Sequence, residues 1–349
     1  MSEQNIIKSG RIEYIDAMRG FTMILVVICH VSGFCLNIDR TNTSFNSFFI
    51  EFRMPLFFFV SGFVLYKCNV LWNWSYTTNF LHKKFYVQIV STFIFFLVHC
   101  SIFNHNIIDN LYNEYKDGYW FTFVLFEFFI IYCLTRLISS SLRLNSLWKD
   151  TFMLCIGVFF FVVTIPSVMT RLHIANEWSG IMSFNHWFLF LFFIIGTLVK
   201  KHFTRFLQLL ERKTLLTACI VVFFGVNIFR DAIMATHINV FRLLTAITGI
   251  IIVFAFFLSH QSFFCNHNHI GRILCFIGRR TLDIYLLHYF LLPTNLSEVI
   301  SVVHNHSMPV IELAISLTIT IIVIAMCLLI SQILRLSPLL GRLLFGVRA

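Results

Sequence analysis

Arg19 and His30 are the residues of this chain whose types and spacing point most clearly to chemistry. Both lie in the first apolar segment, DAMRGFTMILVVICHVSGF. In a helix, eleven steps of about 100° bring the two side chains within roughly 20° of one stripe, about 16 Å apart along the axis. A cation then lies at the edge of the segment and an ionisable imidazole near its middle. Because ionisable groups inside a membrane are costly, the pair predicts a functional site.

A carboxylate and a second imidazole fall at a similar predicted depth. Glu127 lies roughly 13 Å, and His288 about 12 Å, from the inner edges of their apolar segments. Thr281, Tyr285 and His288 follow the spacing i, i+4, i+7, which places them on one polar stripe of a helix. A general base needs an orienting partner, and a mid-membrane contact from His to a carboxylate or to Tyr would supply one.

The composition indicates a polytopic membrane protein. The chain has 349 residues, of which 58% are hydrophobic and only 12% charged, too apolar for a soluble domain. We expect an all-α fold of about ten transmembrane helices in a single domain, residues 1–349. The predicted spans are 20–37, 48–66, 85–103, 119–138, 151–169, 184–200, 214–230, 240–258, 279–293 and 310–334.

The basic residues orient these spans. With a cytoplasmic N-terminus, 19 of the 26 Lys and Arg residues fall in predicted inner loops. Four fall in outer loops and three at or within helices; the outer four are Arg40, Lys116, Arg171 and Arg230. This asymmetry predicts that both termini are cytoplasmic. It also accounts for the net charge of +10 without nucleic acid, because basic loops face anionic lipid or an anionic cytosolic ligand.

Structural readings of the same residues stay open. His288 can serve only to bond a neighbouring backbone carbonyl, and Glu127 can be a structural partner of a buried cation or imidazole. Arg19 and Arg53 can be interfacial cations whose stems lie along apolar surface. The run CNHNH offers Cys265, His267 and His269, but no fourth ligand is placed and a polar loop explains it equally well. The sequence therefore predicts no metal site.

Four motifs carry a resemblance to a known family. RIEYIDAMRGFTMILVVICH resembles the opening signature of the acyltransferase-3 family of integral membrane acyltransferases, in which Arg and His are separated by ten residues. FRMPLFFFVSGF, GYWFTFVLF and GRRTLDIYLLH resemble later signatures of the family. The resemblance covers essentially the whole chain. The MPLFFF form is similar to the stand-alone branch, which includes fucose and polysaccharide O-acetylase-like proteins.

The resemblance implies an enzyme that transfers an acyl group, usually acetyl, from cytosolic acyl-CoA to a hydroxyl of a cell-surface or lipid-linked carbohydrate. Acyl-CoA is then the donor substrate, and no bound cofactor is expected. The expected chemistry residues are His30, Arg19, Glu127 and His288. The cations expected to bind acyl-CoA are Lys83, Lys84, Arg279 and Arg280. Residues that would line the acceptor cleft are Arg53, Trp120 and Trp187.

Two questions remain open at this stage. His30 can act as a general base, or it can carry the acyl group covalently. A different class of protein, a transporter or flippase for a lipid-linked sugar, also suits ten spans and a basic inner face, although no repeated halves are visible. In either case the expected location is a bacterial cytoplasmic membrane, with the lipid bilayer as a partner, no nucleic acid, and an oligomeric state that the sequence does not give.

Overall fold

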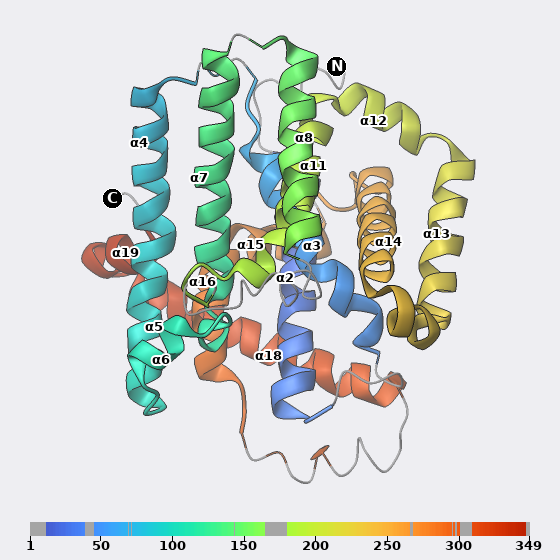
Figure 1. The fold of residues 1–349 in the computed structure, drawn as a ribbon. Helices are drawn as coiled ribbons and strands as arrows, with labels where there is room; N and C mark the ends of the chain where they lie inside the picture. The colour runs from blue at the N-terminus through green and yellow to red at the C-terminus, as the bar shows by residue number, and fades with distance from the viewer. Residues whose placement is uncertain are drawn as a thin grey trace. The chain divides into compact units, whose positions relative to one another are not determined.

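The computed structural model describes residues 12–38, 45–68, 70, 72–142, 144–164, 180–265, 268–294, 296, 299–300 and 309–346. Within these residues every regular element is a helix (Figure 1), as the composition predicts. Arg40, Arg171, His267 and the end of the predicted span 151–169 lie outside the described residues.

Most of the described helices follow one another within about ten residues. Their bounds, in chain order, are α2 Glu13–His30, α3 Ser47–Leu65, α4 Trp74–Lys84, α5 Ser91–Ile102, α6 Ile107–Tyr112, α7 Trp120–Ser141, α8 Ser146–Val163, α11 Phe190–Lys201, α12 Phe203–Leu210, α13 Lys213–Ile228, α14 Arg230–Ser259, α15 His269–Arg279, α16 Thr281–Leu291, α18 Pro309–Leu334 and α19 Pro338–Phe345. Short 3₁₀ and π segments are Val31–Cys35, Phe85–Val90, Lys116–Gly118 and Phe184–Leu189.

The chain forms two compact units. The first is Met1–Val60 with Thr204–Leu329, and the second is Ser61–Phe203 with Ile330–Ala349.

Eight helical segments of the described chain are long and apolar enough to cross a membrane. The predicted spans 214–230 and 279–293 correspond to shorter helices, α13 with 16 residues and α16 with 11 residues. An 11-residue helix rises only about 16 Å, against a hydrocarbon core of roughly 30 Å. α16 ends early because Leu292 adopts φ −65°, ψ 121° before Pro293, and the residue before a proline is disfavoured in the helical region. Ten spans and cytoplasmic termini stay predictions.

In the first unit, α2 and α15 cross with their backbones in contact. A Cβ added at Gly20 would lie 2.1 Å from the carbonyl oxygen of Leu274. A Cβ at Gly278 would lie 1.8 Å from the carbonyl oxygen of Asp16. Only glycine fits at either position, and small residues of this kind let helices approach closely in membranes.

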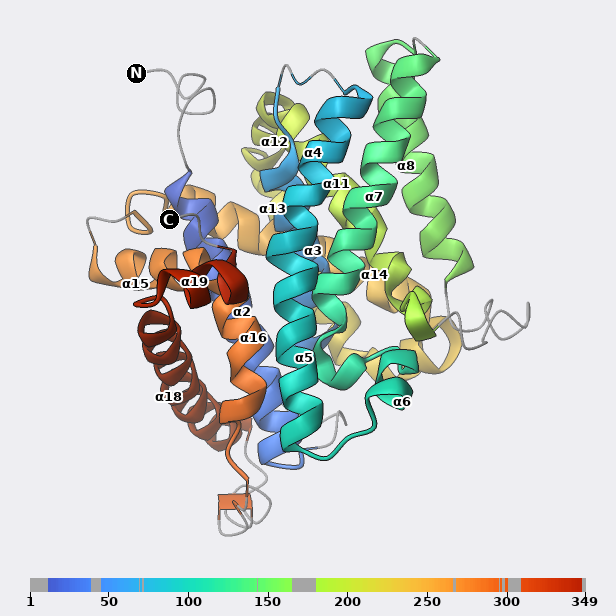
Figure 2. The ribbon, with the colours of Figure 1, turned by 90° about the vertical axis from the view of Figure 1, so that its left-hand side faces the viewer.

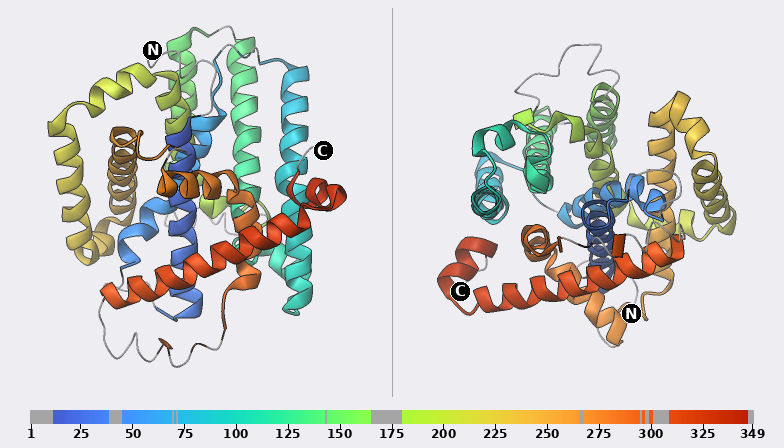
Figure 3. Two further views of the ribbon diagram at one scale, coloured as in Figure 1. Left: turned by 180° about the vertical axis from the view of Figure 1, so that it is seen from behind. Right: turned by 90° about the horizontal axis from the view of Figure 1, so that it is seen from below.

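This crossing sets the course of the next helix. α15 crosses α2, the chain turns at Arg280, and α16 continues beside α2 (Figure 2). Seen from behind, the first part of α18 passes across the far end of α2 (Figure 3, left). α13 and α14 pack against each other as a hairpin, and α14 also contacts α2.

In the second unit, one continuous helical segment, Trp74–Ile102, includes α4, a π-helical stretch and α5. The expectation that Lys83 and Lys84 lie in a loop is therefore wrong: both lie in the last turn of α4. The helix begins earlier because the Asn73 side chain caps it, accepting a hydrogen bond from the backbone N–H of Tyr76 at 2.8 Å. α4 and the π stretch pack along α7, and α8 packs along α11.

The glycine crossing gives a stability prediction. We expect Gly278→Ala to lower the thermal unfolding midpoint of the detergent-purified protein, because the added methyl group meets backbone; overpacking of this kind costs about 1–3 kcal/mol. Gly225 in α13 is the matched control, since a Cβ there meets nothing within 4 Å and alanine has the better helix propensity. A Gly278→Ala protein that melts at or above the Gly225→Ala midpoint would contradict the crossing.

Candidate active site

Two imidazoles meet in the first unit. His30 is the last residue of α2, and His288 lies on α16 with 0% of its surface exposed. The Nδ1 atom of His30 lies 2.9 Å from the Nε2 atom of His288. The two rings are stacked at 10°, with centroids 5.1 Å apart, and the Tyr289 ring contacts both. The sequence indicated a carboxylate or Tyr as the partner of a histidine base; the structure gives a second histidine.

The hydrogen-bond network assigns the protons of this pair. The Nδ1 atom of His288 lies 3.0 Å from the carbonyl oxygen of Ile284 and 2.8 Å from that of Tyr285. Carbonyl oxygens only accept, so Nδ1 of His288 carries the proton and its Nε2 carries the lone pair in the neutral ring. His30 must then donate its Nδ1–H to that lone pair, which leaves the lone pair of His30 on Nε2. The backbone bond expected for His288 is present, and it fixes the protonation of both rings.

Arg19 lies directly before Gly20, at the crossing of α2 and α15, and its side chain contacts the beginning of α16. Its Nη2 donates to the hydroxyl of Thr281 at 3.1 Å, and its Nη1 lies 3.7 Å from the carboxylate of Asp16. Arg280, next to Thr281 in the chain, lies 3.4 Å from the carboxylate of Asp283. The contacts Arg19–Thr281 and His30–His288 show that α2 and α16 run in the same direction.

Arg279 completes a basic group at this end of the helices. It is the last residue of α15, directly after Gly278, and its side chain is exposed. Arg19 and Arg280 each keep 29% of their side-chain surface exposed while paired with a carboxylate. Three guanidinium groups therefore lie at the beginning of α16, each with surface left for an anion.

A buried carboxylate that the sequence reading did not single out supports the end of α2. His30 is followed by a π-helical turn, Val31–Cys35, a feature common at functional sites. Ser32 in this turn donates its hydroxyl to Glu312 at 2.9 Å, and the backbone N–H of Phe45 donates to the other oxygen at 3.1 Å. Glu312 is 6% exposed, near the start of α18. In the sequence, Glu312 could have been recognised because it is a single acidic residue in an apolar segment, which is a feature of functional sites in membranes.

Glu127, Trp120 and Trp187 belong to the second unit. The indole N–H of Trp187 donates to Glu127 at 2.7 Å, so the side chain that bonds Glu127 among the described residues is an indole and not the cation or imidazole of the structural reading. Trp120 stacks on His186, with ring centroids 3.8 Å apart at 21°. His186 was not among the residues predicted from the sequence. Its position directly before Trp187 was the feature that could have identified it.

Lys116 also departs from the expected picture of an ordinary charge in an outer loop. Only 1% of its surface is exposed, and its ammonium group donates to the carbonyl oxygen of Gly180 at 2.7 Å. A second bond at 3.2 Å goes to the carbonyl oxygen of Asn113. Burial lowers the pKa of Lys116 to about 8, against the smaller opposing effect of nearby carboxylates.

The remaining predicted residues have distinct surroundings. In the second unit the Lys84 ammonium lies 4.8 Å from the centre of the Phe129 ring, and Lys83 is exposed.

In the first unit Arg53 lies on α3, and its Nε and Nη1 atoms are buried without a hydrogen-bond partner among the described residues. A half-buried guanidinium with unsatisfied donors is suited to a ligand that accepts hydrogen bonds.

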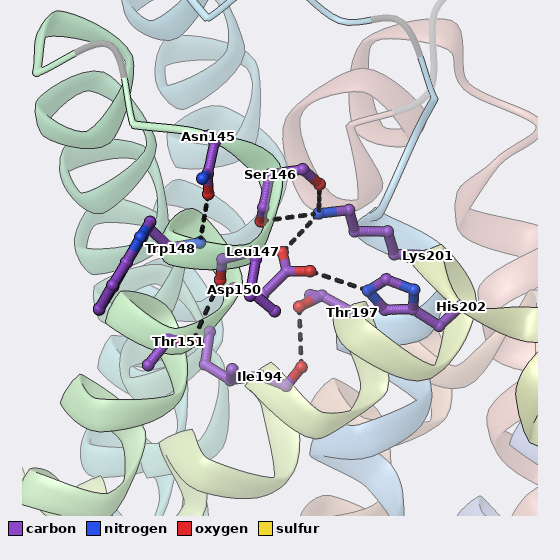
Figure 4. Close-up of polar contacts among 10 residues, drawn as sticks. All are labelled: Asn145, Ser146, Leu147, Trp148, Asp150, Thr151, Ile194, Thr197, Lys201 and His202. Atoms are coloured by element: carbon purple, nitrogen blue, oxygen red, sulfur yellow. Dashed lines mark hydrogen bonds and ion pairs between the residues drawn. The ribbon is translucent and has the colours of Figure 1, made fainter.

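A further cluster of the second unit joins the ends of α8 and α11 (Figure 4). Asp150 lies 2.5 Å from the Lys201 ammonium and 2.8 Å from Nε2 of His202. Lys201 also donates to the hydroxyl of Ser146 at 2.8 Å. The positive charge of Lys201 is thus neutralised within the protein, and the cluster holds two helix ends together.

Comparison with known proteins agrees with the motifs. The chain matches no curated protein and no solved structure. The family model that describes an acyltransferase domain of the acyltransferase-3 type matches residues 12–335. The matched region begins directly before α2, covers most of both units, and includes the histidine pair and every predicted site residue. A match over nearly the whole chain shows that the protein is a membrane protein of the acyltransferase-3 family.

Proposed function

We propose that the protein transfers an acyl group, in the simplest case acetyl, from cytosolic acyl-CoA to a hydroxyl of a cell-surface or lipid-linked carbohydrate. The observation that carries the proposal is the histidine pair, because its hydrogen bonds direct the lone pair of His30 to Nε2. In a member of an acyltransferase family, such an imidazole is suited to take a proton from an attacking hydroxyl.

The reaction follows from these proton positions. Nε2 of His30 takes the proton of the acceptor hydroxyl as the oxygen attacks the thioester carbonyl. His30 becomes an imidazolium, and its Nδ1–H donates to His288, whose own proton points to backbone carbonyls. When the tetrahedral intermediate collapses, the carbon–sulfur bond breaks and the CoA thiolate takes the proton from Nε2. The products are the carbohydrate ester and free CoA, and His30 is neutral again.

A covalent route uses the same atom. Nε2 of His30 attacks the thioester carbonyl, the carbon–sulfur bond breaks, and CoA leaves as the thiolate from an acyl-imidazolium that keeps its Nδ1–H. The carbohydrate hydroxyl then attacks the acyl carbon, the carbon–nitrogen bond breaks, and the hydroxyl proton passes to the thiolate, so that His30 is neutral again. Both routes need a neutral His30 whose Nδ1–H is held by His288. Chemical trapping of an acyl group on His30 with donor alone would select the covalent route.

The donor is recognised, in this proposal, by charge. CoA carries several phosphate charges, and Arg19, Arg279 and Arg280 form a basic group at the beginning of α16. Guanidinium groups bind phosphate through two parallel bonds. Lys83 and Lys84, in the second unit, are proposed separately as point charges that favour the anionic donor.

For acceptor binding we propose Arg53 in the first unit and, separately, Trp120 and Trp187 in the second unit. The unsatisfied donors of Arg53 suit sugar oxygens, and aromatic faces suit the apolar faces of sugar rings. The Trp187 N–H is already held by Glu127, so its indole has a fixed orientation. We place the enzyme in the cytoplasmic membrane of a bacterial cell.

A flippase for a lipid-linked sugar is the alternative. It would need no base, so the proton positions of the histidine pair would serve no purpose in it. Release of CoA by the purified protein, from acetyl-CoA and a carbohydrate acceptor, supports the transferase; absence of release with every acceptor and acyl chain tested, from protein that binds CoA, would favour the alternative.

His30→Ala tests the proposed base. We expect acyl transfer to fall by about 10²–10⁴-fold, the contribution typical of a general base, while the level of membrane-inserted protein stays unchanged. O-acetylation of the surface carbohydrate is the readout. The matched control is His260→Ala, an exposed histidine at the end of α14 that bonds its own helix backbone, Phe256, at 2.9 Å. Near-normal acetylation in well-expressed His30→Ala would remove His30 from the chemistry.

The double substitution of Arg279 and Arg280 by Ala tests donor binding. We expect the apparent KM for acyl-CoA to rise about tenfold or more, because each charge-assisted contact to phosphate contributes about 1.5–3 kcal/mol. Arg212 and Lys213 replaced together by Ala form the control, since they are adjacent, basic and exposed at the start of α13. An equal rise in both double variants would mean that general surface charge, and not this group, attracts the donor. Lys83 and Lys84 replaced together by Ala are expected to raise the same KM.

A further inference from the structure

We propose that the second unit holds a zinc ion at His99, His105 and Asp117, a site independent of the histidine pair. His99 lies in the last turn of α5, His105 follows that helix, and Asp117 lies in the short 3₁₀ turn before α7. Their ligand atoms all lie within 4.8 Å of one another. The acyl-transfer chemistry proposed above uses none of the three.

The two imidazole–carboxylate separations lie on either side of the ligand spacing in a tetrahedral zinc site. The Nδ1 atoms of His105 and His99 lie 2.7 Å and 3.6 Å from the same oxygen, Oδ2 of Asp117. Zinc bonds of about 2.0–2.1 Å at tetrahedral angles place neighbouring ligand atoms roughly 3.3 Å apart. The separation of 3.6 Å is close to the ligand spacing of such a site, and both imidazoles are directed at one carboxylate oxygen.

The backbone, and not only the side chains, brings the ligands together. His105 donates its backbone N–H to the carbonyl oxygen of Cys100 at 2.9 Å, which folds the chain back onto the end of α5. Asn104 and Asp117 adopt positive φ values, 54° and 51°, a region uncommon for residues other than glycine. The His99 and Asp117 side chains are 10% and 17% exposed, while that of His105 is 44% exposed. The ligands therefore face one small volume, open to solvent on one side.

The ligand set narrows the choice of metal. Two neutral imidazoles and one carboxylate bind zinc in four-coordinate sites and iron(II) in six-coordinate sites, whereas magnesium and calcium prefer oxygen ligands alone. The cluster at Asp150 does not offer a zinc site of this kind. It contains only one histidine, and one oxygen of its carboxylate is already paired with the Lys201 ammonium. A bound ion would tie α5 to the turn that carries the buried Lys116 and leads into α7, and with three protein ligands its fourth position would be taken by water.

Zinc binding by the full-length protein tests the site. The protein is purified in detergent, its affinity tag is removed, and it is stripped with a chelator and equilibrated with zinc chloride. We expect about one zinc per chain by elemental analysis and a rise in the thermal unfolding midpoint, because zinc binds the folded state. His105 is exposed, so His105→Ala should not disturb packing. It should weaken zinc binding by at least about 10–100-fold, because replacing residues that only support the metal ligands already lowers metal affinity by this factor. It should also remove the zinc-dependent rise in midpoint.

Two further variants complete the test. Asp117→Asn keeps the side-chain size and should also weaken binding, which guards against a folding defect of one variant. His202→Ala removes a histidine paired with Asp150 and should bind zinc as the unaltered protein does. The proposal is overturned if the unaltered protein takes up no zinc, if His105→Ala binds it with unchanged affinity, or if His202→Ala loses it equally.

Discussion

The backbone contact between α2 and α15 is the constraint on which the candidate site depends. Gly20 and Gly278 let the two helices touch, and no side chain fits between them. α16 begins three residues after Gly278, so the crossing fixes where it starts and which way it faces. Arg19 then meets Thr281, and His30 meets His288 about seven residues further along α16. The register of the site is thus set by two glycines that take no part in its chemistry.

The second feature is the direction of the hydrogen bonds. His288 is fully buried, and its Nδ1–H is held by two carbonyl oxygens of its own helix. This arrangement makes His288 an acceptor and His30 a donor, so the basic atom of the pair is Nε2 of His30. Ser32 and Phe45, both bonded to Glu312, hold the chain on the far side of His30. The imidazole is positioned from both sides before any substrate binds.

Much of this was visible in the sequence. Hydrophobic composition gave the fold class, and the motifs put Arg19 and His30 on one helix and His288 on another. Their depth in a membrane stays a prediction, and His30, expected near the middle of its segment, is the last residue of α2. The contact between His30 and His288 was not predictable, because 258 residues separate them and no local pattern records which helices pack together. Lys83 and Lys84 were expected in a loop because the apolar run begins only after them. The helix that contains them starts at Trp74, nine residues before Lys83, where Asn73 caps it. Lys116 was misread because burial of a lysine depends on the carbonyl groups that other segments supply.

A double-mutant cycle tests most directly whether His288 acts through His30. The rate of acyl transfer is measured for the unaltered protein, His30→Gln, His288→Gln and the double variant, each at saturating donor. If the two imidazoles act as one unit, the double variant is no slower than His30→Gln, within about threefold, because His288 has nothing left to orient. Multiplication of the two single losses would contradict this, since it would mean that the histidines contribute independently.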